Sequence, residues 1–193
     1  MGNYTEAERE SLRNWCDEFR RDGVFDIKSD RNPLYNCIGY AMGTKAHFVA
    51  LGRLDRLPWC WWPHGVATNC SPKSLIDAFA FMGFVETDNP KVEADYDKVA
   101  LYEKGGKWTH AARIEEDNKY HSKLGTEYDI IHRAGDVFHE VDYGDIYAYM
   151  KRSVRDRALT QQLLPAIGTV IYNGQRLAIM IENGRTVGFM PIK

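Results

Sequence analysis

The sequence predicts an α+β fold, with helices in the first half of the chain and an antiparallel sheet after them. Apolar residues recur at helical spacing in residues 5–22, whereas short strand-like segments separated by turn residues begin at residue 98. The chain has 193 residues, of which 44% are hydrophobic. This is enough for the core of one domain of ordinary size with a small appendage.

Three helices are expected before the sheet. They span residues 5–22, 36–43 and 72–83, and the segments 24–36 and 44–72 are expected to be loops. Ser71 and Pro72 favour the start of the third helix, because serine is a good N-cap and proline fits the first helical position. A glycine closes each of the three helices, which is the usual residue at a helix C-terminus.

The sheet is expected to be an antiparallel meander. Its strands are predicted at residues 98–102, 108–114, 119–124 and 129–132, and residues 143–150 favour a strand or a short helix. The tail is predicted to form a helix at residues 153–164 and three strands at 168–172, 176–182 and 185–190. Asn-Gly pairs separate the last three strands, which is a strong hairpin signal. We therefore expect a main domain over residues 1–152 and a helix-plus-hairpin extension over 153–193.

Composition excludes several classes of protein. The net charge is −2, so nothing indicates a basic nucleic-acid-binding surface. No apolar run is long enough to cross a bilayer, and the first residues carry no apolar signal core. Four cysteines are too few for a disulfide-stapled secreted domain. The sequence therefore predicts a cytoplasmic protein without membrane or nucleic-acid partners.

The segment around Trp59, Trp61 and Trp62 concentrates aromatic residues and is expected to belong to the core or to a packed loop. Within it, Cys60, His64 and Cys70 offer a weak zinc pattern. A structural zinc site needs four ligands, commonly with one close cysteine pair, and neither condition is met. We therefore expect no metal and no cofactor, and a zinc module is the weakest of three functional hypotheses.

Cys37 is the strongest candidate for a nucleophile. It follows Asn36 at the expected start of a short helix, where free N–H groups and the positive end of the helix dipole stabilise a thiolate. A thiol in this position still needs a base. His110 is the best candidate among the six histidines, because it begins a predicted strand and small residues after it allow a helix to pack closely.

Several segments resemble a family of small, mostly bacterial proteins and, through it, the papain-like (NlpC/papain-type) cysteine hydrolase superfamily. The resemblance covers about residues 30–150 in matching order. The matching segments are Asn36-Cys37-Ile38-Gly39-Tyr40-Ala41, Trp61-Trp62-Pro63, Phe81-Met82-Gly83-Phe84, Lys98-Val99-Ala100-Leu101-Tyr102, Thr109-His110-Ala111-Ala112-Arg113, Ser122-Lys123-Leu124-Gly125 and Asp129-Ile130-Ile131-His132.

The resemblance implies a thiol hydrolase in which Cys37 attacks and His110 takes its proton, with a thiolate–imidazolium pair at rest. Asp129 is the expected third member, because a carboxylate fixes the tautomer of an imidazole and stabilises its charged form. Ser122 or His121, in the strand after His110, is an alternative orienting group, and Ser122 is also counted among the substrate-binding residues.

The oxyanion hole is expected at the backbone N–H of Cys37, with help from Asn32 or Asn36. Papain-like relatives usually carry glutamine or asparagine upstream of the cysteine; no glutamine precedes Cys37, and which asparagine serves stays open.

Two function classes follow. The first is an acyl-transfer hydrolase (a peptidase, amidase or deamidase) acting on a protein or peptide-like substrate. The second is a non-catalytic protein-binding module on a papain-like scaffold, in which the tryptophan cluster and the tail hairpin form recognition surfaces. The hairpin also offers an edge strand through which two copies of the chain could pair.

Overall fold

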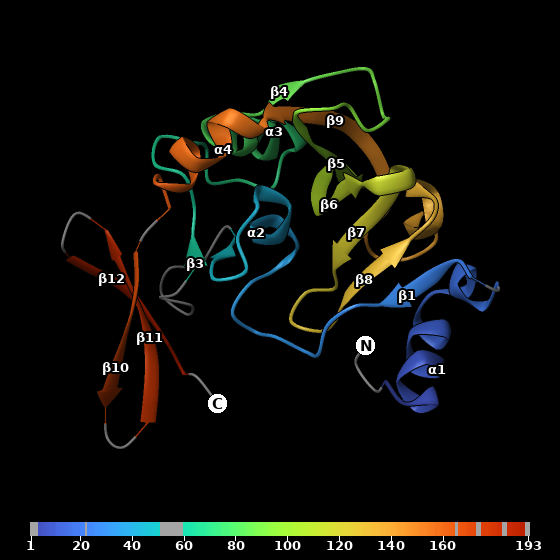
Figure 1. The fold of residues 1–193 in the computed structure, drawn as a ribbon, viewed down its shortest axis with the longest axis horizontal. Coiled ribbons are helices and arrows are strands. Elements are labelled where there is room, and N and C mark those ends of the chain that lie inside the picture. Colours follow the sequence, from blue (N-terminus) through green and yellow to red (C-terminus); the bar gives the residue numbers. More distant parts are fainter. Residues whose placement is uncertain are drawn as a thin grey trace.

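The computed structural model describes residues 4–21, 23–50, 60–164, 166–172, 175–182 and 185–191. The fold is α+β, as the sequence predicts, with an antiparallel seven-stranded sheet between two layers of helices (Figure 1). The helices are α1 (Glu6–Trp15), α2 (Cys37–Met42), α3 (Pro72–Phe81) and α4 (Val154–Gln161), with 3-10 turns η1 (Asp17–Arg20), η2 (Glu116–Asn118) and η3 (Gly135–Phe138).

The seven-stranded sheet has the order β1-β8-β7-β6-β5-β9-β4. Its strands are β1 (Phe25–Ile27), β4 (Val85–Glu86), β5 (Tyr96–Lys104), β6 (Lys107–Glu115), β7 (Lys119–Lys123), β8 (Asp129–His132) and β9 (Asp145–Ser153). The tail forms a separate antiparallel sheet of β10 (Ala166–Tyr172), β11 (Gln175–Glu182) and β12 (Arg185–Pro191). Two short parallel strands, β2 (Phe48–Val49) and β3 (Cys60–Trp61), pair with each other.

Local sequence explains where the helices begin. Thr5 and Glu8 form a capping box at the start of α1, in which each side chain accepts a hydrogen bond from the other residue's backbone. Asn36 caps α2 through Gly39, and Ser71 caps α3 directly before Pro72. Gly43 closes α2 in the left-handed conformation with φ of 96°, which glycine adopts without strain.

The first helix is shorter than the sequence predicts. It ends at Trp15, and Cys16 adopts an extended conformation before the chain continues as η1. Cys16 and Phe19 are both buried, and the Cys16 thiol donates a hydrogen bond to the carbonyl of Val137, 3.2 Å away. Burial of both side chains against the sheet layer therefore replaces the last turn of the expected helix.

Four short strands lie where the sequence predicts loops or no element. β1 falls within residues 24–36, β2 and β3 fall within 44–72, and β4 follows α3. Each has two or three residues, so hydrophobic alternation cannot reveal it. Pairing with a neighbouring strand, such as that of β1 with β8, decides their conformation.

Two hydrophobic clusters cover the two faces of the main sheet. The first lies between the sheet and the helices α2 and α3, and contains Val99, Leu101 and Ala111. The second lies between the other face and α1, η1 and η3, and contains Ala100 and Ala112. Neighbouring residues of β5 and β6 thus contribute to opposite layers, as strand alternation requires.

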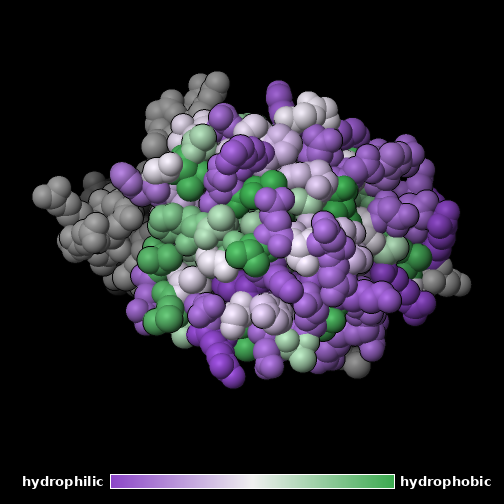
Figure 2. Space-filling model, turned by 90° about the horizontal axis from the view of Figure 1, so that it is seen from above, coloured by the Kyte–Doolittle hydropathy of each residue, from purple (hydrophilic) through white to green (hydrophobic). Residues whose placement is uncertain are grey.

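Hydrophobic side chains also reach the surface over α3, β4 and α4. Figure 2 shows hydrophobic atoms gathered on the upper face of the molecule, where these elements lie in Figure 1. The exposed apolar residues of these elements are Phe81, Val85, Val154 and Leu159. No helix within the described ranges is long and apolar enough to cross a membrane.

Arg152 connects the helical layer to the sheet. Its side chain is only 1% exposed, and its guanidinium donates to the carbonyls of Met42 and Met82, at the C-terminal ends of α2 and α3. It also pairs with Asp97 of β5 at 2.9 Å and donates to Thr160 of α4 at 3.0 Å. A single buried cation therefore binds three helices and a central strand.

We expect Arg152→Met to lower the free energy of unfolding by about 3 kcal/mol, because it leaves buried carbonyls unpaired and breaks a buried ion pair. Urea denaturation followed by circular dichroism measures the change. Arg157→Met is the matched control: Arg157 also binds Asp97, but its side chain is 41% exposed, so the loss should be below about 1 kcal/mol. Equal losses in the two variants would show that burial of Arg152 is not decisive.

Candidate active site

Cys37 occupies the first turn of α2, as the sequence predicts. It is 7% exposed and packs in the first cluster, beside Ala111 of β6. The backbone N–H groups of Cys37, Ile38 and Ala111 all interact with its sulfur and favour the charged form. The sulfur therefore lies next to the peptide group that joins His110 to Ala111.

Burial nevertheless keeps Cys37 protonated. Desolvation is the largest influence and raises the pKa of the Cys37 thiol to about 11, against the opposing effect of the N–H groups around the sulfur. This differs from the expected resting thiolate. The short α2 does provide donors, but removal of the sulfur from water destabilises the thiolate more than these hydrogen bonds stabilise it.

The side chain of His110, a residue of β6, points into the second cluster and not into the first cluster that contains Cys37. It is completely buried, and its ring packs edge-on against Tyr102 and Phe138 of the second cluster. Ala111, the next residue, faces the layer that contains Cys37. In the described structure no hydrogen bond joins Sγ of Cys37 to the imidazole, so the expected dyad contact is not formed at rest.

A buried hydrogen-bond chain orients His110. Nε2 of His110 lies 3.0 Å from Oγ of Ser122, which lies 2.9 Å from Nε2 of His132. Nδ1 of His132 is 2.8 Å from the carbonyl oxygen of Ala134. Ser122 thus contacts the imidazole of His110, which is the orienting position that the sequence predicts as one alternative.

The series of hydrogen bonds from His110 through Ser122 to His132 determines which nitrogen of each imidazole carries the proton. A carbonyl only accepts, so Nδ1 of His132 carries the proton and Nε2 of His132 accepts from the Ser122 hydroxyl. Ser122 has one proton, so its oxygen must accept from Nε2 of His110. Nδ1 of His110 is consequently an unprotonated nitrogen, and it is buried without a partner.

Both histidines are neutral at pH 7. Burial lowers the pKa of His132 to about 4, although its hydrogen bond to Ala134 opposes the shift. Burial lowers the pKa of His110 well below its usual value, and repulsion from His132 adds to the effect. His110 therefore offers a free base rather than the imidazolium expected from the sequence.

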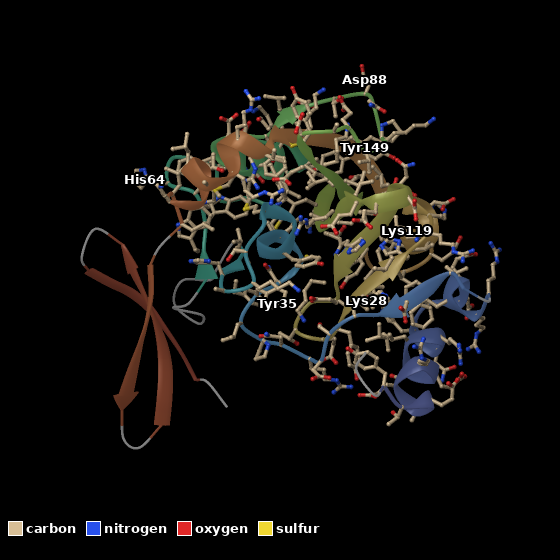
Figure 3. The ribbon with its side chains drawn as sticks, viewed as in Figure 1. Lys28, Tyr35, His64, Asp88, Lys119 and Tyr149 are labelled. Carbon is tan, nitrogen blue, oxygen red and sulfur yellow. The ribbon has the colours of Figure 1, made fainter. Side chains whose placement is uncertain are left out.

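Asp129 does not orient the imidazole. Its carboxylate, 2% exposed, accepts hydrogen bonds of 2.8 Å from Tyr35 Oη and Lys45 Nζ. Figure 3 shows Tyr35 below α2, near the turn between β7 and β8. Asp129 also binds Ser29 through its backbone N–H, so it anchors the segment that leads into Cys37.

The two candidate oxyanion residues have structural roles. Asn36 Oδ1 accepts from the N–H groups of Gly39 and Val49, while its Nδ2 donates to the carbonyl of Val49 at 2.6 Å. Asn32 Oδ1 accepts from the N–H of Leu34 at 2.9 Å and shapes a turn. The Nδ2 donor of Asn36 is thus engaged by a carbonyl, and the donors that the described residues place at the sulfur are the backbone N–H groups of Cys37, Ile38 and Ala111.

Tyr143 was not anticipated from the sequence. Its ring lies flat on His110, with 4.1 Å between ring centroids and 10° between planes. Burial and then the charge of a Cys37 thiolate raise the pKa of Tyr143, so its phenol also lies within electrostatic range of the sulfur. Tyr143 follows an irregular connection to β9, and no local pattern indicates that it would reach His110.

Lys123 is a second unanticipated member of the surroundings. Its side chain is buried, its Nζ donates to the carbonyl of Glu127, and it lies 5.1 Å from the ring centre of Tyr35. Burial lowers the pKa of Lys123 to about 8, although the charges of Asp129, Glu127 and Cys37 oppose the shift. The motif Ser122-Lys123-Leu124-Gly125 contained this residue, but only the strand pairing shows its burial.

The tryptophan segment is described only in part, so the weak zinc pattern through Cys60 lies partly outside the described residues. Trp61 is buried, and Trp62 stacks on Trp108 at 5.8 Å, while Trp59 and the side chain of Cys60 lie outside the described residues. Within the residues that the structure describes, no group of three or more histidine, cysteine or acidic side chains could hold a metal ion.

The buried histidines should make the fold sensitive to acid. His132 has a folded-state pKa of about 4 against about 6.5 when unfolded, so the unfolded chain binds more protons between these values. Stability is therefore complete above pH 6.5 and falls by about 3 kcal/mol for this group as pH decreases to 4. Urea denaturation at a series of pH values measures this loss in the free energy of unfolding.

His132→Gln should have a shallower loss of stability in this window than the parent protein. His139→Gln is the control, because His139 is exposed and the neighbouring Asp145 raises its pKa, so its removal cannot relieve the acid sensitivity. An identical slope in His132→Gln and the parent would contradict the assignment.

Cys37 should alkylate slowly at neutral pH. Since its pKa is about 11, the rate with iodoacetamide should rise about tenfold for each pH unit up to that value. Cys70 is exposed and serves as the internal reference. Peptide mapping by mass spectrometry gives both rates, and faster labelling of Cys37 than of Cys70 at pH 6 would instead indicate a resting thiolate.

Comparison with known proteins gives one family. The family described as "Domain of unknown function (DUF7689)" matches residues 26–151, which is 126 of the 193 residues and extends from β1 into β9. The matched segment contains Cys37, His110, Ser122 and His132. No curated protein and no solved structure matches the chain. The chain belongs to the DUF7689 family.

Proposed function

We propose that this protein is a cysteine-dependent acyl-transfer hydrolase of papain-like type, with Cys37 as nucleophile and His110 as general base. The observation that carries the proposal is the free Nδ1 of His110. The chain through Ser122 to His132 keeps the proton on Nε2 and leaves a basic nitrogen unpaired in the interior. An unpaired buried acceptor costs stability, so a role for it in proton transfer accounts for its retention.

The sulfur supports the same proposal. It belongs to the first turn of a helix and interacts with the N–H group between His110 and Ala111. The same backbone N–H groups would stabilise an oxyanion on a carbonyl that the sulfur attacks. A nucleophile at a helix start over an antiparallel sheet also supports the papain-like assignment, which otherwise depends on the resemblance of the motifs.

The reaction would proceed in two steps. Sγ of Cys37 forms a bond to the carbonyl carbon of an amide or ester while its proton passes to Nδ1 of His110, which returns it to the leaving amine or alcohol as that bond breaks. Water then attacks the thioester, which releases the acid and restores the thiol. The sulfur and Nδ1 must first move into contact, because they approach β6 from different layers.

A protein-binding module is the second candidate. It is favoured by the burial of Cys37, because a thiol with a pKa of about 11 is a weak nucleophile at neutral pH. In this case the free nitrogen of His110 would be an unsatisfied core atom without a chemical role.

An acyl probe distinguishes the two functions. Incubation with p-nitrophenyl acetate should release nitrophenolate and leave an acetyl group on Cys37, which mass spectrometry of the peptides locates. Cys37→Ser should abolish the thioester adduct, and His110→Gln should slow acylation about 100-fold or more. Because the pKa of His110 lies well below 6.5, the acylation rate should not fall between pH 7 and pH 6 through protonation of this base.

Two controls make the result specific. His121→Gln changes a partly buried histidine on β7 that pairs with Glu115 and, within the described residues, forms no hydrogen bond to His110, Ser122 or His132. Cys70→Ser removes the exposed thiol. Both should acylate at the parent rate. Acylation that is absent from Cys37 in the folded parent, or equal in His110→Gln and the parent, would favour the binding module.

A further inference from the structure

A pocket opens on the other side of Tyr143. It has a volume of about 320 Å³ and lies between α1, Arg31, the turn from β7 to β8, and residues 142 and 143. Its walls are mostly aromatic or aliphatic, from Leu12, Trp15, Leu124, Tyr128 and Tyr143. This size and lining are typical of sites that hold one apolar group.

Tyr143 is the wall between this pocket and His110. Its ring stacks on the imidazole and forms T-shaped contacts with Trp15 and Phe138, at 5.5 Å and 5.1 Å between ring centroids. The same residue lines the pocket. A rotation of one side chain would therefore join the pocket to the imidazole.

The charges of the pocket limit what it accepts. Arg31 is already engaged, because it donates to Tyr128 Oη at 2.9 Å and pairs with Glu127 at 2.8 Å. Asp142 has no ion-pair partner among the described residues and leaves the rim negative. A carboxylate on the occupant would be repelled, whereas a neutral or basic group would not.

We propose that this pocket holds an aromatic side chain of a neutral or basic peptide substrate, and that Tyr143 is the gate between it and the Cys37–His110 pair. This rests on the proposed function and adds to it a substrate class and a route. Aromatic rings are favoured because Trp15, Tyr128 and Tyr143 offer ring faces and edges for stacking.

Binding is tested without catalysis in Cys37→Ser. Titration with N-acetyl-phenylalanine amide should shift the indole N–H signal of Trp15 in the NMR spectrum, whereas the alanine and glutamate analogues should shift it at least tenfold less at equal concentration. Ser11→Trp, at an exposed position on the rim, should fill the pocket and abolish the shift. Asn14→Trp is the control, since it is exposed on the same helix but does not line the pocket.

The gate is tested by alkylation in the protein with its native cysteines. Tyr143→Ala should raise the rate of Cys37 labelling by iodoacetamide roughly tenfold or more, because the ring it removes covers His110 and lies within electrostatic range of the Cys37 sulfur. Tyr143→Phe keeps the ring and should label like the parent. If Tyr143→Ala does not fold, the comparison of Ser11→Trp with Asn14→Trp in phenylalanine amide binding still tests the pocket.

The outcomes separate this inference from the proposed function. Aromatic binding that Ser11→Trp abolishes, with no acyl adduct on Cys37, would retain the pocket as a peptide site and reject the hydrolase. Acylation of Cys37 that neither Ser11→Trp nor Tyr143→Ala alters, together with equal shifts by all three amides, would overturn the pocket and the gate.

Discussion

The buried guanidinium of Arg152 is the interaction on which the arrangement of layers depends. Helix α2 ends at Met42 and α3 has Met82 as its C-cap, and each helix end leaves carbonyl oxygens that no further turn satisfies. Arg152 binds both carbonyls and is itself neutralised by Asp97, whose pKa stays below its ordinary value because hydrogen bonds from two arginines outweigh burial. This contact holds the C-terminal end of α2, the helix that begins with Cys37, against the sheet.

Burial and polar contacts together set the protonation states of Cys37 and His110 in the candidate site. At Cys37, burial prevails over the N–H groups of the helix start, and the sulfur stays protonated. At His110, burial removes the positive charge, and the link through Ser122 to His132 fixes the remaining proton on Nε2. In the proposed reaction a neutral thiol would pass its proton to a neutral imidazole during attack, once the two side chains are brought into contact, in contrast to a preformed ion pair.

Access is the remaining constraint on chemistry. The imidazole has no exposed surface, and Tyr143 covers it on the side of the pocket at α1. If the protein acts as we propose, a substrate has to displace this covering ring before it reaches the imidazole.

Caps and hydrophobic periodicity act over a few residues, so the sequence alone predicts the α+β class, the helix starts at Asn36 and Ser71, the main strands, and the placement of Cys37 in a first helical turn. The meander also places Ser122 near His110. Other features depend on long-range packing. The two-residue strands, the burial of Lys123, the engagement of Asp129 by Tyr35, and the contacts of His132 and Tyr143 with the site depend on strand register and layer packing. These bring together residues distant in the chain, and a shift of one residue along β6 would turn His110 to the opposite face of the sheet.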